Sequence, residues 1–227
     1  MKFIVIEGID GSGKSTQINM LKQHLNNKKI KYKFLHFPRT GSLVYGDLIA
    51  RFLRGEFGDL NTVNPYLVAL IYAGDRNDAK TKIRNWLNEG NVVIVDRYVK
   101  SNIAFQCAKI LSAEEKNKLK NWILFLEFQY NKIPKPDISI FLDVPFDFTS
   151  KNLTKKRLGE DRNYLNGKSD IHETDLDFQK KVKEEYLSMV REDKSFYLIE
   201  CRKEKDTVLD PEDIFKKIIS ILPLGTR

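Results

Sequence analysis

Five short, mostly apolar segments recur along the chain and predict buried strands, and the first of them is rich in β-branched residues. They cover residues 3–6, 32–37, 92–95, 138–142 and 196–199. Uniformly apolar strands of this length are typical of parallel sheets, because helices cover both faces of such sheets. A parallel sheet binds its ligands beyond the carboxyl ends of its strands. We therefore expect the functional residues to follow residues 6, 37 and 95.

The segments between the strands carry helical patterns. After the first strand, Ile18, Leu21 and Leu25 recur at three- and four-residue intervals. Asn64 and Pro65 form a favoured helix start, an N-cap residue followed by a proline in the first turn. Alternating strands and helices predict an α/β fold with helices on both faces of the sheet. The predicted helices cover residues 14–27, 43–53, 64–87, 113–130, 147–156, 176–191 and 211–222, with a further helix from about residue 101.

The segment from Gly8 to Ser15 matches the phosphate-loop pattern Gly-x4-Gly-Lys-Ser and lies between a predicted strand and a predicted helix, as this motif requires. Glycines let the backbone N–H groups curl inward, and the amino end of the following helix adds a positive field. Lys14 is expected to reach the β- and γ-phosphates, and the Ser15 hydroxyl to ligate Mg²⁺. The predicted site for the phosphates of ATP comprises Gly8, Asp10, Gly11, Ser12, Gly13, Lys14, Ser15 and Thr16.

Two acidic residues accompany this loop. Phosphates repel a carboxylate, so Asp10 inside the loop either faces solvent or is aimed at an acceptor sugar or metal-bound water, and we favour the second interpretation. Asp96 ends the third predicted strand, where a carboxylate can hold Mg²⁺ through water. Arg97 follows it, and a guanidinium binds two phosphate oxygens in fork geometry, although a purely structural Asp–Arg pair has the same sequence.

Three further residues suit a second nucleotide. Tyr72 and Arg76 are four residues apart on a predicted helix and share one face, so the ring and the guanidinium can grip a base together. A tyrosine at the edge of the core and an arginine on the surface would give the same sequence pattern without binding a base. Arg39 follows Phe37 and Pro38 in the loop after the second strand, a position that suits a phosphate.

Residues 151–173 are polar and basic and contain several glycines and asparagines between two predicted helices. They fit either a solvated surface loop or a mobile lid that closes on the phosphates and excludes water. A lid of this composition also supplies cations to the transferring group, and in phosphoryl transfer such cations carry much of the catalysis.

Composition narrows the remaining classes of function. The chain has 227 residues, 41% of them hydrophobic and 31% charged, with a formal net charge of +8 spread along its length. A basic excess attracts polyanions, but no long block of basic residues is present, and we do not expect nucleic acid to be a partner. The two cysteines and three histidines show neither a disulfide framework nor metal-ligand spacing. We find no signal peptide and no apolar run of roughly 20 residues, which favours a cytoplasmic location without membrane contact.

Together these motifs resemble those of thymidylate kinases over nearly the whole chain. The phosphate loop has an acid at Asp10, and Phe-Pro-Arg at residues 37–39 is similar to that family's loop after its second strand. Residues 72–76 are similar to its aromatic-x3-Arg helix, and Asp-Arg-Tyr-x2-Ser-Asn at residues 96–102 is similar to its Asp-Arg-Tyr motif. Pro-Lys-Pro-Asp at residues 134–137, just before a strand, is also typical of the family.

The resemblance implies both a fold and a reaction. The fold is a three-layer P-loop NTPase with a five-stranded parallel sheet of order 2-3-1-4-5, in a single domain over residues 1–227 with a mobile lid at about residues 151–173. The reaction transfers the γ-phosphate of ATP to dTMP, giving dTDP for dTTP synthesis, with Mg²⁺ as cofactor and a homodimer as the usual assembly. The implied substrate-binding residues are Phe37, Arg39, Tyr72, Arg76, Arg97, Tyr98, Ser101, Asn102 and Phe105, with Ser15 and Asp96 at the metal.

One departure from the family concerns the catalytic cation. Some members place an arginine inside the phosphate loop, where this chain has Gly11, and members with glycine there carry the cation on the lid. The family's lid motif Asp-Arg-x-Glu aligns either with Asp161-Arg162 or with residues 170–173, which lack the arginine. The predicted catalytic residues are Asp10, Lys14, Arg97 and, on the lid, Lys156, Arg157 or Arg162.

Three alternatives stay open. A deoxynucleoside kinase or a kinase for another monophosphate shares these features, but a nucleoside acceptor would not need Arg39 and Arg97 at an acceptor phosphate. A non-catalytic nucleotide switch would carry a base-reading Asn-Lys-x-Asp, which the sequence lacks. A basic nucleic-acid-binding protein is the third alternative. The preference for dTMP over dUMP and the residues that contact adenine do not follow from the sequence.

Overall fold

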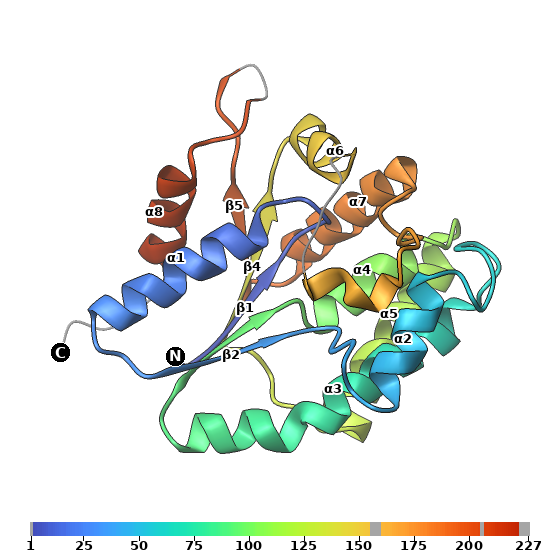
Figure 1. Ribbon diagram of the computed structural model, residues 1–227, viewed down its shortest axis with the longest axis horizontal. Coiled ribbons are helices and arrows are strands. Elements are labelled where there is room, and N and C mark those ends of the chain that lie inside the picture. Colours follow the sequence, from blue (N-terminus) through green and yellow to red (C-terminus); the bar gives the residue numbers. More distant parts are fainter. Residues whose placement is uncertain (1, 155–159, 205–206, 223–227) are drawn as a thin grey trace.

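Five parallel strands form the centre of the computed structural model, which describes residues 2–154, 160–204 and 207–222, with the backbone alone at 154 and 160–162. The strands pair in the order β2-β3-β1-β4-β5, which confirms the predicted α/β fold and strand order (Figure 1). Their bounds are β1 (Phe3–Glu7), β2 (Tyr32–His36), β3 (Val92–Asp96), β4 (Ile138–Asp143) and β5 (Phe196–Glu200).

The three central strands end in acidic residues. β1, β3 and β4 are buried along their whole length, as their uniformly apolar sequences predict, whereas the edge strands β2 and β5 are partly exposed. Each central strand continues one residue past its apolar run, to Glu7, Asp96 and Asp143, because the pairing extends that far. Three carboxylates are thereby placed at the carboxyl edge of the sheet, where ligands of parallel sheets bind.

Helices cover both faces of the sheet and complete three layers. On one face, α1 and α8 pack with the even-numbered side chains of β1, and on the other face α3, α4, α5 and α7 pack with its odd-numbered ones (Figure 1). None of the helices in the described part of the chain is long and apolar enough to cross a bilayer. The helices are α1 (Lys14–Asn27), α2 (Tyr45–Leu53), α3 (Pro65–Asn88), α4 (Val99–Cys107), α5 (Ala113–Leu124), α6 (Phe146–Thr154), α7 (Leu176–Glu192) and α8 (Pro211–Ile221).

Two short helical segments depart from the sequence-based prediction. The helix predicted over residues 113–130 divides into α5 and a π-helix, η1 (Phe125–Tyr130), in which the Asn131 N–H bonds the Leu126 carbonyl. The wider π turn leaves Glu127 fully buried, and such turns occur often at functional sites. The predicted lid contains a 3₁₀-helix, η2 (Glu160–Leu165), which apolar periodicity does not reveal.

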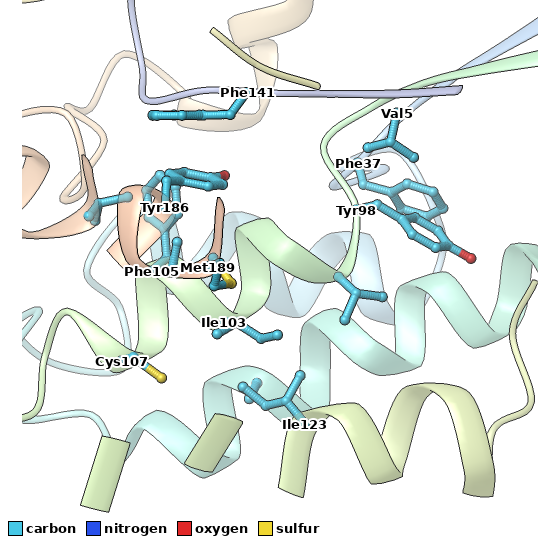
Figure 2. Packing of buried hydrophobic residues seen from close by; sticks show 14 of the residues in the cluster. Val5, Phe37, Tyr98, Ile103, Phe105, Cys107, Ile123, Phe141, Tyr186 and Met189 are labelled. Carbon is cyan, nitrogen blue, oxygen red and sulfur yellow. The ribbon is translucent and has the colours of Figure 1, made fainter. Parts of the chain in front are cut away.

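An aromatic layer supports the carboxyl edge of the sheet. The rings of Phe141 on β4 and Tyr186 on α7 stack with their centroids 4.7 Å apart, so they join the sheet to the helix above it (Figure 2). Tyr98 packs against Phe3 and Phe37 on the other side of this core. Both tyrosines lie directly behind polar residues at the strand ends, which gives those residues a rigid base.

Candidate nucleotide-binding site

A cavity of about 900 Å³ opens at the carboxyl ends of the strands. Most of the residues that the sequence predicts for a nucleotide site line it, although they come from five places in the chain: the phosphate loop, the loop after β2, α3, the end of β3 and α4. The predicted residues found on its wall are Asp10, Gly11, Ser12, Gly13, Lys14, Ser15, Phe37, Tyr72, Arg76, Asp96, Arg97, Ser101, Asn102 and Phe105. Gly8, Thr16, Arg39 and Tyr98 are not part of the described lining.

The phosphate loop joins β1 to α1 and curls back on itself. Gly11 and Gly13 have φ angles of 76° and 83°, a left-handed conformation that side chains disfavour. The buried Lys14 ammonium folds over the loop and donates to the carbonyl oxygens of Gly8, at 3.3 Å, and Ile9, at 3.1 Å. Burial and the nearby Arg97 charge lower the pKa of Lys14 to about 8. The loop therefore brings a cation to the amino end of α1, where phosphates bind.

Asp10 turns its carboxylate into the protein rather than to solvent. Its Oδ1 accepts a hydrogen bond from the Arg97 guanidinium at 2.6 Å, and its Oδ2 accepts one from the Gln179 amide at 2.9 Å. Burial raises the pKa of Asp10, but Arg97 and Lys14 outweigh burial and hold that pKa below its ordinary value. Asp10 is therefore ionised, and its carboxylate joins the phosphate loop to Arg97.

Arg97 is fixed by a network that begins at β1. Its backbone φ of 62° is unusual for a residue with a side chain, and such strain persists only where the surroundings hold it. Its guanidinium donates to Ser101 Oγ at 3.1 Å and Tyr186 Oη at 3.4 Å, and lies 5.0 Å from the Phe105 ring centre. Both hydroxyl groups in turn bond the buried carboxylate of Glu7, at 2.5 and 3.0 Å. Arg97 is thereby held toward the cavity before any ligand binds.

Asp96 offers an oxygen suited to a hard cation. Its Oδ2 accepts a hydrogen bond from His36 Nδ1 at 3.2 Å, while its buried Oδ1 has no hydrogen-bond partner among the described residues. Burial raises the pKa of Asp96, but His36 and Lys14 outweigh burial, so that the pKa is lowered. Ser15 lines the same cavity. A carboxylate and a hydroxyl oxygen are ligands that Mg²⁺ accepts, usually together with water and substrate phosphates.

The far end of the cavity combines a buried ion pair with two unpaired acceptors. Arg76 Nε donates to both oxygens of Glu127, at 2.9 and 3.1 Å, and both side chains are almost completely buried. Asn102 Nδ2 donates to the Ala69 carbonyl at 3.0 Å and to Glu127 at 3.2 Å. The side-chain oxygens of Asn102 and Gln106 are buried without a hydrogen-bond partner in the part of the chain that the structure describes. A ligand with ring N–H groups fits these acceptors.

Two predicted substrate residues have other partners in this structure. Arg39 bonds Asp75 through Nε at 2.8 Å and Asp78 through Nη2 at 2.6 Å, outside the cavity lining. The Tyr98 hydroxyl donates to the Pro134 carbonyl at 3.0 Å, and its ring belongs to the core below the cavity.

Comparisons with known proteins decide the family. The family described as "Thymidylate kinase" matches residues 6–211. A probable thymidylate kinase of Pyrobaculum aerophilum is 30% identical over 96% of this chain and 98% of its own length. A thymidylate kinase of Caldanaerobacter subterraneus is 33% identical over 89% of this chain and 88% of its own. The chain belongs to the thymidylate kinase family. A solved thymidylate kinase of Candida albicans, described as having broad substrate specificity, superposes with a TM-score of 0.70 at 26% identity, over 97% of this chain and 90% of its own.

The lid predicted from the resemblance to thymidylate kinases is only partly described. Lys156 and Arg157 lie outside the described residues, as does the side chain of Arg162. In the described part, Asn152 Nδ2 donates to the Gly11 carbonyl at 2.9 Å, and the Tyr164 hydroxyl donates to Asp170 at 2.9 Å. In the described part of the lid, residues 164, 170, 172 and 173 line the cavity.

Four supporting residues of this family member are absent from the sequence-based prediction. Glu7 precedes the phosphate loop, and its position at the end of a strand is a signal that was available from sequence. Glu127, Gln179 and Tyr186 lie on helices where their neighbours are ordinary surface and core residues. Gln179 and Tyr186 are seven residues apart and therefore share one face of α7, but nothing in the sequence indicates which element that face contacts.

Proposed function

We propose that this chain catalyses the Mg²⁺-dependent transfer of the γ-phosphate of ATP to dTMP, giving dTDP. One observation carries the proposal: a single cavity holds a phosphate loop at one end and an aromatic-arginine-asparagine pocket at the other, with Asp10 and Arg97 between them. A donor and an acceptor nucleotide placed in these two ends have their phosphates near this pair. Family membership and the names of the relatives give dTMP as the acceptor.

On the donor side, the loop amides and Lys14 bind the β- and γ-phosphates of ATP. Ser15 and, through water, Asp96 hold the metal, and a bound Mg²⁺ ion neutralises negative charge on the phosphates. The unpartnered Asp96 Oδ1 supports this assignment, because a buried carboxylate oxygen without a partner is costly unless a cation or water satisfies it.

On the acceptor side, Arg97 binds the phosphate of dTMP, and Asp10 holds Arg97 in line with the donor. Arg39 joins this phosphate once it leaves Asp78. An acceptor phosphate is already an anionic nucleophile, so the residues need only position it and stabilise charge, and no general base is required.

The thymine base occupies the far end of the cavity. Tyr72 stacks on the ring, while the Arg76 guanidinium and the Asn102 side chain bond its polar edge. Gln106 adds a further acceptor beside them. Phe105 forms the wall beside the deoxyribose, and Phe37 closes the pocket from the loop after β2.

The remaining expectations also belong to this proposal. Lys156, Arg157 or Arg162 supplies the lid cation, and the chain works as one cytoplasmic domain. Exposed apolar side chains of Leu67 and Leu70 on α3 support a homodimer, because α3 is the longest helix and offers a continuous face. Light scattering of the purified protein tests the assembly, and a monomer at micromolar concentration contradicts it.

A coupled assay of ADP release tests the reaction. We expect turnover with ATP and dTMP, weaker turnover with dUMP, and none above background with dGMP or thymidine. Chelation of the metal should abolish turnover, and added Mg²⁺ should restore it. If the protein does not turn over dTMP but does turn over another monophosphate or thymidine, the proposed acceptor is wrong and that compound takes its place.

A further inference from the structure

Gln179 is a fully buried amide that connects two distant parts of the site. It lies in the first turns of α7, and its Nε2 donates to Asp10 Oδ2 at 2.9 Å and to the His172 carbonyl at 2.9 Å. Its Oε1 accepts the backbone N–H of Asp10 at 3.2 Å. The opposite orientation of the amide would face its oxygen to two acceptors, so only one orientation satisfies all three contacts.

These contacts account for the position of the Asp10 carboxylate. One Asp10 oxygen binds Arg97 and the other binds Gln179, so the carboxylate has a fixed rotamer between them. Without the amide, a carboxylate oxygen and a backbone N–H of Asp10, both partly buried, would lose their partners together. The carboxylate would then turn toward water in the cavity, and Arg97 would lose the partner that aligns it.

The third contact joins the phosphate loop to the last residues of the predicted lid. Residues 170–173 line the cavity through Asp170, His172 and Glu173, and the Gln179–His172 bond fixes the backbone of this segment. The His172 ring packs between Phe105 and Phe178, with centroids 5.0 and 5.4 Å away. One amide therefore sets the distance between the loop that binds the donor and a wall of the acceptor pocket.

We infer that Gln179 is a positioning residue for the transfer reaction, one that holds the Asp10 carboxylate against Arg97 and ties the phosphate loop to residues 170–173. The inference rests on the proposed function, because it is the acceptor phosphate that Asp10 and Arg97 align. Among the described residues, the hydrogen bonds of Gln179 to the loop are all made at Asp10 and none at Lys14 or a glycine, so binding of ATP should depend on it little.

The variant Gln179→Met removes the amide and keeps the length of the side chain. A hydrogen bond to a charged group contributes enough that kcat/KM for dTMP should fall about 10- to 100-fold, while KM for ATP should stay within about twofold. The matched control is Asn91→Leu, since Asn91 is also buried and bonds a backbone carbonyl and a carboxylate, but at the opposite end of β3. We expect the control to lose comparable thermal stability and keep both kinetic constants.

A double-mutant cycle with Asp10→Ala decides whether Gln179 acts through Asp10. If it does, Gln179→Met should cost less than about threefold in kcat/KM for dTMP once Asp10 is alanine, because coupled residues are non-additive. An equal loss in both backgrounds, or a loss shared equally by dTMP and ATP, would overturn the inference and leave Gln179 as a packing residue.

The wild-type protein, the two single variants and the double variant are also compared by urea unfolding without substrate. If the two substitutions change the free energy of unfolding non-additively, the contact between residues 10 and 179 is supported. Additive changes would contradict the contact, and this result does not depend on which acceptor the enzyme uses. Lack of turnover of dTMP by the wild-type protein would refute the proposed function alone, because the unfolding cycle does not depend on the reaction. If Gln179→Met does not fold, Gln179→Leu replaces it in both cycles.

Discussion

The donor and acceptor ends of the cavity are built in different ways. The donor end is one run of eight residues, from Gly8 to Ser15, whose backbone amides and single lysine need only the strand before it and the helix after it. The acceptor end gathers arginines from three elements, and each of them already holds a carboxylate in the structure. The donor end is therefore local in sequence, whereas the acceptor end depends on tertiary partners.

The three acceptor arginines differ in how deeply their ion pairs are buried. Arg76 and its partner Glu127 are 2% and 0% exposed, whereas Arg39 and Asp78 are 20% and 58% exposed. Arg97 with Asp10 is intermediate. A buried charge must keep its partner, while an exposed pair contributes little and exchanges readily. The gradient suits a rigid base pocket, an aligned central arginine and, at the rim, an arginine whose outer pair with Asp78 exchanges more readily than its pair with the buried Asp75.

The largest expected effect tests the donor end. Replacing Lys14 with methionine keeps the length of the side chain but removes the cation over the phosphates, so kcat should fall by about 10³-fold or more. The unfolding midpoint should change little, because the cost of burying the ammonium offsets its hydrogen bonds to the carbonyls of Gly8 and Ile9. The matched control is Lys216→Met on the exposed face of α8, which should retain full activity. A loss under tenfold for Lys14→Met would contradict the assigned role.

The second prediction tests the deepest pair of the acceptor end. Glu127→Gln leaves the buried Arg76 charge without a counterion, which should lower the free energy of unfolding by about 3–5 kcal/mol, measured with urea. KM for dTMP should rise about tenfold, because Asn102 shares the same carboxylate. Glu114→Gln on the exposed face of α5 is the control and should change stability by less than about 0.5 kcal/mol. A loss under about 1 kcal/mol for Glu127→Gln would mean that water reaches and solvates the Arg76 guanidinium when its counterion is removed.

The contrast also explains what the sequence could predict. Apolar strands and the phosphate loop follow from local patterns, because each element carries its own signal over consecutive residues, whereas the strand order was predicted from the family resemblance. Tyr72 and Arg76 were predicted from their shared helix face and Asn102 from the resemblance, and the structure brings all three to the lining of one cavity. The partner of Arg76 was not predicted, because Glu127 is 51 residues away on a π-helix that helical periodicity does not distinguish from α5. The partners of Arg39 were not predicted either, because its pairing with Asp75 and Asp78 depends on tertiary packing.

The third prediction uses pH to separate the two ends. Lys14 titrates with a pKa of about 8 in the free protein, so above pH 8 it loses its proton and kcat/KM for ATP should fall by up to about tenfold per pH unit. At saturating ATP the bound phosphates raise the pKa of Lys14, and kcat should stay level. The pKa of Arg97 is raised from an already high value, since the Asp10 charge outweighs burial, so kcat/KM for dTMP should not fall between pH 8 and 9.5. Arginine does not titrate in this range, so Lys14→Arg should make kcat/KM for ATP independent of pH between pH 8 and 9.5. If kcat/KM for ATP still falls in this variant, a group other than Lys14 is responsible for the titration.

The smallest expected effect tests the rim of the acceptor end. Asp78 is the exposed partner of Arg39, and an exposed ion pair contributes about 0.3–0.6 kcal/mol, so Asp78→Asn should leave stability almost unchanged. If Arg39 must leave Asp78 to reach the acceptor phosphate, the same variant should lower KM for dTMP about two- to threefold, because the competing partner is gone. Arg39→Gln should raise that KM instead, so the two substitutions shift it in opposite directions. A rise of KM in both variants would show that the Arg39–Asp78 pair itself shapes the pocket, and the rim would then be as fixed as the buried pair of Arg76 and Glu127.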